Sequence, residues 1–115
     1  MAKYEQNLKG NLNDLITWIH KDITNNNSLV SFGDGSDINL KDSRVAVRVY
    51  ERYSSFGGSR VSMNITITET GEELFISVIT LGGTLGGFFK NTIVEERFLK
   101  LCKESVENYI REQEK

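Results

Sequence analysis

The sequence is poor in residues that constrain a chain: among 115 residues there is no proline, one cysteine and one histidine. A single cysteine cannot form a disulfide within the chain, and it has no cysteine or histidine neighbours at metal-ligand spacing, so we expect neither a disulfide nor a metal site. Without proline, turns depend on glycine, asparagine and aspartate. The ten glycines all lie between segments of regular hydrophobic periodicity, which indicates where strands and helices end.

Long apolar runs and a large charge of one sign are also absent. No run approaches the roughly 18 apolar residues that cross a bilayer, and the start of the sequence lacks the apolar region of a signal peptide, so we expect no membrane segment. A formal net charge of −2 gives no general attraction for a polyanion, which disfavours nucleic acid as a partner. The content of 38% hydrophobic and 26% charged residues predicts one globular domain over residues 1–115, in the cytoplasm and without a cofactor.

Three stretches of alternating apolar and polar residues dominate the middle of the chain, at residues 44–53, 61–68 and 72–81. A period of two is typical of strands, and the glycine-containing loops between the stretches predict antiparallel neighbours. The third stretch is apolar on both faces, so we expect a ligand, a partner or the chain's own termini to cover its second face. The predicted core face consists of Val45, Val47, Val49, Val61, Met63, Ile65, Ile67, Leu74, Ile76 and Val78.

The loops between these stretches also predict their registers. A two-residue loop at residues 70–71 places Ile67 opposite Leu74, which keeps the apolar side chains of both strands on one face. The preceding hairpin, with two glycines in its loop, pairs Tyr53 with Ser59.

Shorter elements are predicted before residue 44. Residues 3–8 alternate weakly and predict an edge strand, and residues 29–32 predict a short strand. Residues 33–37, Gly-Asp-Gly-Ser-Asp, predict a turn that leads into a brief extended piece at residues 38–40. The two aspartates of this turn lack the spacing of a calcium-binding loop, so we interpret them as turn-forming residues.

Two helices are predicted from apolar residues at three- and four-residue spacing. Asn11 caps the first helix, and a capping box of Thr92 and Glu95 starts the second, which should run for about 18 residues. Their buried stripes are Leu12, Leu15, Ile16, Ile19 and Ile23 in the first, and Val94, Phe98, Leu101, Ser105 and Tyr109 in the second. The sequence therefore predicts an α+β fold, in which an antiparallel meander of four to six strands carries an N-terminal helix and a long C-terminal helix on one face.

The alternating residues Arg48, Tyr50 and Arg52 are predicted on the sheet face away from the core. The predicted hairpin places Arg52 opposite Arg60, and because two facing arginines repel each other, we expect an anion, a glutamate or solvent between them. Arginines beside an aromatic ring also suit stacking on single-stranded nucleic acid, whereas a solvated sheet face is the simpler interpretation.

His20 and Cys102 have no chemical partner that can be identified in the sequence. His20 lies beside the buried stripe of the first helix, without a predicted nucleophile or carboxylate next to it. Cys102 lies inside the second helix, where a thiol is usually an inert, buried side chain. The glycine-rich residues 82–87 lack the lysine and hydroxyl residue of a phosphate-binding loop, so they are either a functional loop or a plain connector.

Four stretches, RVAVRVYERY at residues 44–53, GGSRVS at 57–62, GG at 82–83 and FFK at 88–90, resemble a small uncharacterised family of bacterial proteins, mostly from Firmicutes. The resemblance implies a stand-alone bacterial domain, and that family has no assigned activity or binding residues. The order of elements is also similar to the helix-grip fold of lipid- and polyketide-binding proteins. This chain is shorter by a strand or two, which argues against a large enclosed cavity.

These observations leave the biochemical activity unknown and assign no catalytic residue. The leading hypothesis is a non-enzymatic binding or interaction module that uses the second sheet face, with a homodimer through that face as its simplest form. The alternative is a protein, or an enzyme, that binds a small apolar ligand between the sheet and the C-terminal helix, near Phe88 and Phe89. The candidate ligand or partner surface consists of Arg48, Tyr50, Arg52, Arg60, Phe75, Ile79 and Leu81.

Overall fold

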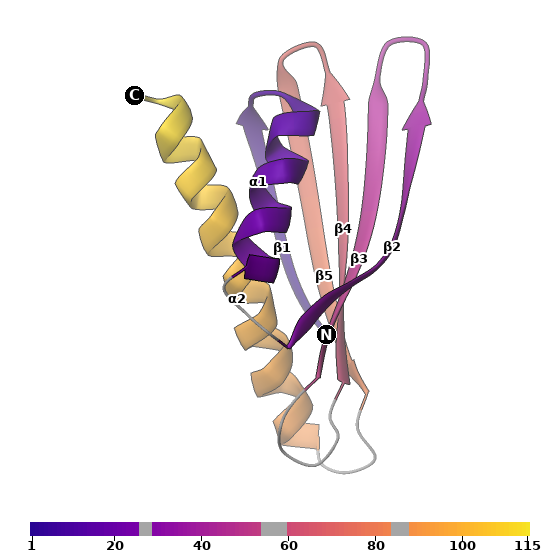
Figure 1. Ribbon diagram of the computed structural model, residues 1–115, viewed down its shortest axis with the longest axis vertical. Coiled ribbons are helices and arrows are strands. Elements are labelled where there is room, and N and C mark those ends of the chain that lie inside the picture. Colours follow the sequence, from indigo (N-terminus) through magenta and orange to yellow (C-terminus); the bar gives the residue numbers. More distant parts are fainter. Residues whose placement is uncertain (26–28, 54–59, 84–87) are drawn as a thin grey trace.

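The computed structural model describes residues 1–25, 29–53, 60–83 and 88–115, with side chains given for all of these except residues 83 and 88–92. Five strands form one antiparallel sheet in the order β1-β5-β4-β3-β2 (Figure 1). The elements are β1 (Ala2–Lys9), α1 (Leu12–Asn25), β2 (Val30–Asn39), β3 (Arg44–Tyr53), β4 (Arg60–Thr70), β5 (Glu73–Gly83) and α2 (Phe88–Gln113). The predicted α+β fold and the predicted edge strand at the start of the chain are thereby confirmed.

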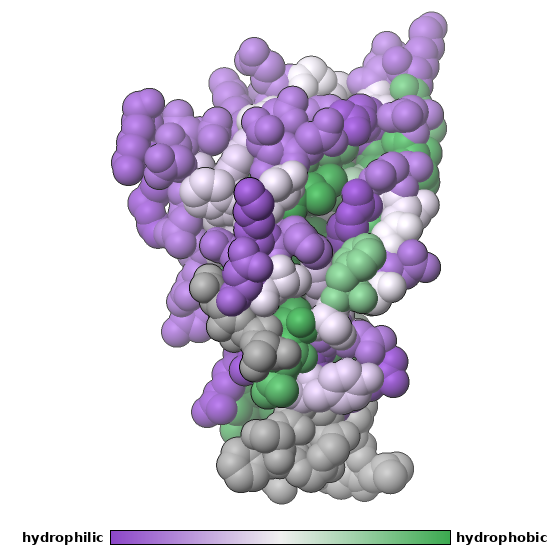
Figure 2. Space-filling view, viewed as in Figure 1, coloured by the Kyte–Doolittle hydropathy of each residue, from purple (hydrophilic) through white to green (hydrophobic). Residues whose placement is uncertain are grey.

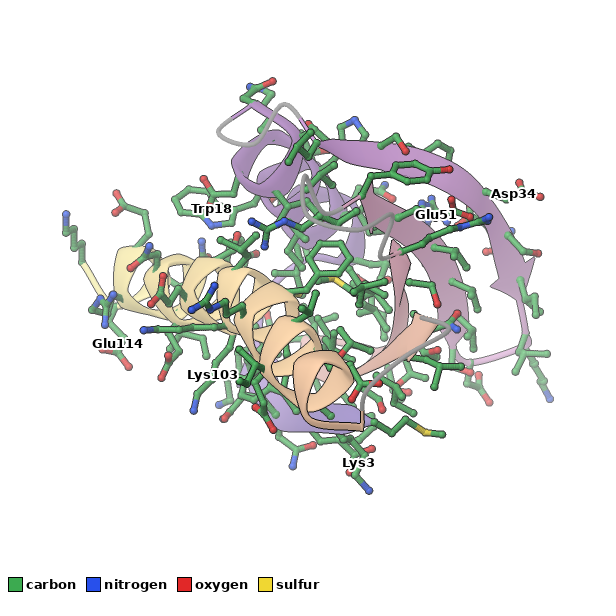
Figure 3. The ribbon with its side chains drawn as sticks, turned by 90° about the horizontal axis from the view of Figure 1, so that it is seen from below. Lys3, Trp18, Asp34, Glu51, Lys103 and Glu114 are labelled. Atoms are coloured by element: carbon green, nitrogen blue, oxygen red, sulfur yellow. The ribbon has the colours of Figure 1, made fainter. Side chains whose placement is uncertain are left out.

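Both helices lie on one side of the sheet, and the sheet curls around them so that β2 approaches α1 (Figures 1 and 3). We call this side the helix side and the other the open face. The core fills the space between the helix side and the helices. It includes Ala46, Tyr50, Val61, Met63, Ile65, Ile67, Leu74, Ile76 and Val78 from the sheet, and Leu12, Leu15, Ile19, Ile23, Phe98, Cys102, Val106 and Tyr109 from the helices.

Helix α1 forms as the sequence predicts. The side-chain oxygen of Asn11 accepts a hydrogen bond of 3.1 Å from the backbone N–H of Asp14, which satisfies one of the free donors at the helix start. On the same helix, the indole N–H of Trp18 donates to the carbonyl of Ser105 over 2.9 Å, so α1 is fixed against α2 by a polar contact as well as by burial.

Helix α2 begins earlier than predicted, at Phe88, so Thr92 and Glu95 lie inside the helix and the predicted capping box is wrong. The Glu95 carboxylate is buried and accepts hydrogen bonds from the N–H of Gly82 over 2.7 Å and from the amino group of Met1 over 2.6 Å. Burial alone would raise the pKa of Glu95, but these two donors outweigh it and lower the pKa. Neither helix, over the described residues, is both long and apolar enough to cross a membrane.

The β4–β5 hairpin differs from the prediction by two residues. Ile67 lies opposite Ile76 and not Leu74, because the two loop residues are Gly71 and Glu72. Gly71 has a φ of 61°, and glycine at the first loop position is what a type II′ turn prefers. A shift of two residues keeps every side chain on its face, so the predicted core residues of both strands are buried.

The β3–β4 pair differs by one residue, which reverses the predicted faces of β3. Tyr53 pairs with Arg60 instead of Ser59, and the loop of residues 54–59 lies outside the described residues. Ala46 and Tyr50 therefore enter the core. The three valines that were predicted to do so, Val45, Val47 and Val49, lie on the open face. The prediction failed because β3 carries apolar side chains on both faces, so hydrophobicity alone does not define its buried side.

Strand β2 is continuous through the segment predicted as a turn. Its register shifts between Phe32 and Asp34, which leaves Gly33 as a bulge. A Cβ at Gly33 would lie 3.2 Å from the carbonyl oxygen of Val49, so the bulge brings the two backbones close together. The bulge places Phe32 opposite Tyr50, on the helix side.

Candidate functional site

The seven residues predicted as one surface lie on two opposite faces of the sheet. Strand pairing puts Arg48, Tyr50 and Arg52 on the helix side, where Tyr50 is only 1% exposed. It puts Arg60, Phe75, Ile79 and Leu81 on the open face. The predicted surface is therefore two separate regions.

The centre of the open face carries no charged side chain. We call its nine central residues the open-face field: Val45, Val47 and Val49 on β3, Asn64, Thr66 and Thr68 on β4, and Phe75, Ser77 and Ile79 on β5. Charged residues border the field, with Lys3 on β1 and Asp34 on β2 pointing away from the helices (Figure 3). This arrangement, an uncharged centre inside a charged rim, is typical of protein interfaces.

Arg60 lies beyond one end of this field and has a partner. Its guanidinium is 2.6 Å from the carboxylate of Glu51 and 5.9 Å from the ring centre of Tyr53. The hydrogen bond to Glu51 raises the pKa of Arg60. Arg52 is opposite Val61 and on the other face, so the predicted repulsion between Arg52 and Arg60 is wrong. An exposed pair of this kind contributes little to stability.

On the helix side, a pocket of about 320 Å³ lies between α1 and the strands β2 and β3. We call it the α1–β3 pocket. Its lining residues are Ile16, Thr17, His20 and Lys21 from α1, Phe32 from β2, and Arg48 and Tyr50 from β3. In Figure 2 hydrophilic side chains cover most of the helix side, and hydrophobic ones reach the surface to the right of α1, toward β2.

Three aromatic rings in mutual contact form the wall of this pocket. The ring centres are 5.5 Å apart for Phe32 and Tyr50, 6.0 Å for His20 and Phe32, and 5.8 Å for His20 and Tyr50. The first two pairs meet nearly edge to face, which is a favoured geometry for aromatic rings. Tyr50 is fully buried, whereas Phe32 is 48% exposed. The buried ring of Tyr50 thus forms the floor of the pocket, and the half-exposed ring of Phe32 forms an apolar wall that a ligand can reach.

The only histidine is held by the buried tyrosine. The hydroxyl of Tyr50 and Nδ1 of His20 are 2.8 Å apart. Burial raises the pKa of Tyr50 to about 12, so its hydroxyl keeps the proton at neutral pH. The tautomer of the imidazole decides whether this hydroxyl donates to Nδ1 or accepts from it. The contact fixes the orientation of the His20 ring.

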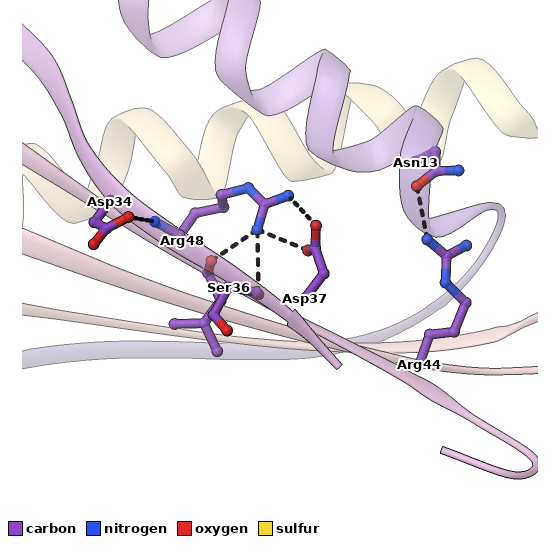
Figure 4. Close-up of polar contacts among 8 residues, drawn as sticks. Asn13, Asp34, Ser36, Asp37, Arg44 and Arg48 are labelled. Atoms are coloured by element: carbon purple, nitrogen blue, oxygen red, sulfur yellow. Dashed lines mark hydrogen bonds and ion pairs between the residues drawn. The ribbon is translucent and has the colours of Figure 1, made fainter. Parts of the chain in front are cut away.

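Arg48 is immobilised at the side of the pocket (Figure 4). Its guanidinium contacts the Asp37 carboxylate at 2.9 and 3.3 Å and donates to the carbonyl of Val47 over 2.8 Å. The same hydrogen bond lowers the pKa of Asp37. Gly35 leaves room for the Arg48 side chain, because a Cβ at residue 35 would lie only 2.8 Å from Cδ of Arg48. The neighbouring Asp34 accepts from the N–H of Gly35 over 2.7 Å and takes no part.

A second, larger hollow of about 520 Å³ runs between β1 and α2. The Tyr4 hydroxyl at its wall is buried without a hydrogen-bond partner among the described residues, and Nζ of Lys103 lies 5.8 Å from the Tyr4 ring centre. Burial raises the pKa of Tyr4 to about 12. Both signs of charge line this hollow, as Lys3, Arg97, Lys100, Lys103, Glu96, Glu104 and Glu107. It is therefore less selective than the α1–β3 pocket.

The α1–β3 pocket was not predicted, because its residues come from three elements separated in the chain. The sequence contains one signal of it: Thr17 lies three residues before His20 and four before Lys21, next to the buried stripe of the first helix. The predicted site near Phe88 and Phe89 falls on side chains outside those described. Of the predicted glycine-rich loop, Gly82 and Gly83 end β5, and residues 84–87 are outside the described residues.

Comparison with known proteins identifies a family whose function is unknown. Residues 1–110 match the model of a family of unknown function, DUF6054, so the chain belongs to this family. The match covers nearly the whole chain and confirms the predicted resemblance to an uncharacterised family. No curated protein matches the sequence significantly.

Proposed function

We propose that this member of the DUF6054 family is a non-enzymatic module that binds a small ligand in the α1–β3 pocket. One observation carries the proposal: aromatic rings and polar donors converge on the same concave site. A volume of about 320 Å³ is at the lower end of ligand pockets, which are apolar with a few placed polar groups. The site lies between the sheet and α1, and it differs from the predicted pocket between the sheet and the C-terminal helix, which falls on side chains outside those described.

The energetic basis is the apolar surface that Phe32 leaves in water. Complete burial of a phenylalanine side chain is worth roughly 1.5–3 kcal/mol, so a ligand that covers its exposed half gains about 1 kcal/mol from this ring alone. The buried Tyr50 and the immobilised Arg48 hold the remaining wall in place before binding. A site formed in advance loses little conformational entropy when the ligand enters.

The test is a screen of small aromatic and aliphatic fragments against isotope-labelled protein by NMR. Binding should shift the resonances of His20 and Phe32. The variant Phe32→Ala should weaken every hit, and the control Tyr53→Ala should weaken none, since Tyr53 is equally exposed, at 49%, but lies on the open face. Shifts that appear only outside the pocket, or hits that survive Phe32→Ala unchanged, would refute the proposal.

A second candidate function, self-association, is favoured by the symmetry of the open-face field. Its two mainly apolar stripes, on β3 and β5, flank the uncharged polar stripe on β4. A two-fold axis parallel to β4 would lay β5 of one copy over β3 of the other, and β4 over β4. Lys3 and Asp34 end the same row of paired residues at opposite edges, so this axis also brings opposite charges to the same side.

The size of the field predicts that such a dimer is weak. Three strands about 4.8 Å apart, over some six residues, cover roughly 300 Å². A stable interface usually buries about 800 Å² on each partner. The curl of the sheet also turns β1 and β2 away from the contact (Figure 3). We therefore expect dimers only at high concentration.

A further inference from the structure

The charges around the α1–β3 pocket are unequal. Among the residues that the structure describes, Lys21 and Arg48 line it, and no aspartate or glutamate does. Arg48 is already neutralised by Asp37, with its donors directed at that carboxylate and at backbone carbonyls. Lys21 has no ion pair with any residue that the structure describes. The pocket thus retains one uncompensated positive charge, which favours a ligand with one negative charge.

The donors that could meet this negative charge lie together on α1. Thr17 lies three residues before His20 and four before Lys21, and all three side chains line the pocket. They offer a hydroxyl, an imidazole and an ammonium group. The ammonium group can form a charge-assisted hydrogen bond with a carboxylate, and the Thr17 hydroxyl lies on the same face of α1 as Lys21.

The apolar part of the pocket lining determines which uncharged group of a ligand fits. Phe32 and Tyr50 present aromatic surface, and Ile16 adds aliphatic surface beside them. A flat ring stacks well against such a wall, and the small volume excludes a long alkyl chain. The polar donors lie on α1 and the apolar wall lies mainly on β2 and β3, so the two ends of the ligand are distinguished.

We propose that the α1–β3 pocket binds a small aromatic carboxylate, with its ring against Phe32 and Tyr50 and its carboxylate at Lys21. This inference rests on the proposed function and adds the chemical class of the ligand. It assigns Lys21 the role of the charge anchor and Phe32 that of the ring platform.

The experiment titrates labelled protein with benzoate, benzamide and acetate, each to about 10 mM, which saturates a site with a dissociation constant of about 1 mM. Benzamide keeps the ring without the charge, and acetate keeps the charge without the ring. Benzoate should shift the His20 and Phe32 resonances and bind about tenfold more tightly than either of the others.

The matched variants are Lys21→Met in the pocket and Lys41→Met, another exposed lysine, outside it. Lys21→Met should weaken benzoate about tenfold and leave benzamide unchanged, while Lys41→Met should change neither. If benzamide binds as tightly as benzoate, or if Lys21→Met has no effect, the ligand class is wrong although the pocket still binds. If none of the three probes shifts pocket resonances, the ligand class is also wrong, and the fragment screen decides the binding function separately.

Discussion

At the scale of single residues, burial determines how the only cysteine reacts. Cys102 is completely buried in the core, and burial raises the pKa of its thiol to about 12. Only the thiolate is a good nucleophile, so the folded protein should not react with iodoacetamide at pH 8. We expect complete alkylation in denaturant and almost none without it over the same time, measured by intact mass. Fast alkylation of the folded protein would contradict the buried position.

A second prediction at this scale concerns Tyr50 and alkaline pH. The pKa of Tyr50 is raised to about 12, against about 10 in an unfolded chain, so the folded state holds the proton more tightly. The stability that this provides is fully present below about pH 10 and is lost as the pH rises through about 12. Between about pH 9.5 and 11.5 the unfolding free energy of the wild type should therefore fall more steeply than that of Tyr50→Phe.

Urea denaturation at a series of pH values measures this difference. At pH 8 the variant Tyr50→Phe should be about 1 kcal/mol less stable, because it loses the hydrogen bond to His20. Tyr4 also has a raised pKa and is present in both proteins, so its contribution cancels. If the unfolding free energy falls equally steeply with pH in the two proteins, folding does not raise the pKa of Tyr50.

At the scale of elements, the close approach of β2 and β3 depends on Gly35. A Cβ there would lie 2.8 Å from Cδ of Arg48 and 2.9 Å from the carbonyl oxygen of Val47, so Gly35→Ala must move backbone or expel Arg48 from its contacts. We expect a loss of about 1–3 kcal/mol in unfolding free energy and shifted resonances of His20. Urea denaturation and NMR spectra measure both.

The control for this variant is Gly71→Ala in the β4–β5 turn. No atom of the described residues lies within 4 Å of a Cβ at Gly71, but its φ of 61° strains any other residue. The expected loss is about 1–2 kcal/mol, without any change at His20. An unchanged α1–β3 pocket in Gly35→Ala would show that Arg48 has another way to reach Asp37.

Sequence periodicity predicts some of the helices and strands better than others. Helix α1 and the strands other than β2 were predictable, because period and capping residues agree with the final structure at Asn11 and along β4 and β5. Residues 33–37 of β2 were predicted as a turn. The buried side of β3 was not, because it depends on whether the preceding loop shifts the pairing by an odd or even number of residues. The register between β4 and β5 differs from the prediction by two residues, so the side chains of β5 keep their predicted faces. The register between β3 and β4 differs by one residue, so Tyr50 lies in the core and Val47 lies on the open face.

The site was less predictable than the fold for a related reason. Arg48 and Tyr50 were recognised as candidates, but Tyr50 was assigned to the wrong face, so its partner His20 on α1 could not be inferred. The contribution of Phe32 depends on the bulge at Gly33, and that segment was predicted as a turn. Contacts among three elements require the register of each of them, which local patterns do not supply.

At the scale of the whole molecule, the open-face field predicts weak self-association. Val47→Glu should abolish it, because it buries a carboxylate in an uncharged contact. In the proposed arrangement Val47 lies over Ser77 of the other copy, since the two residues belong to one row of the sheet. Adding Ser77→Lys to Val47→Glu should therefore restore association. Sedimentation velocity from about 10 µM to about 1 mM covers the affinities expected of a small interface.

The control for self-association is Ile93→Glu, which adds the same charge to an exposed apolar residue on α2, away from the field. It should associate like the wild type. A wild-type protein that is monomeric at every concentration, or a Val47→Glu variant that associates normally, would exclude this face as the contact between copies. Failure of the double variant alone would reject the proposed axis and retain the face.

The order of strands in the sheet also affects how the chain folds. Strands β2 to β5 each pair with a neighbour in sequence, so this meander closes only short loops as it forms. Strand β1 instead pairs Ala2 with Thr80 and Lys9 with Glu73, and the chain between the two strands contains α1 and β2 to β4. Closing so long a loop costs entropy before its contacts are gained, which places it late in folding. The strand of this sheet that is synthesised first is thus the last to join it.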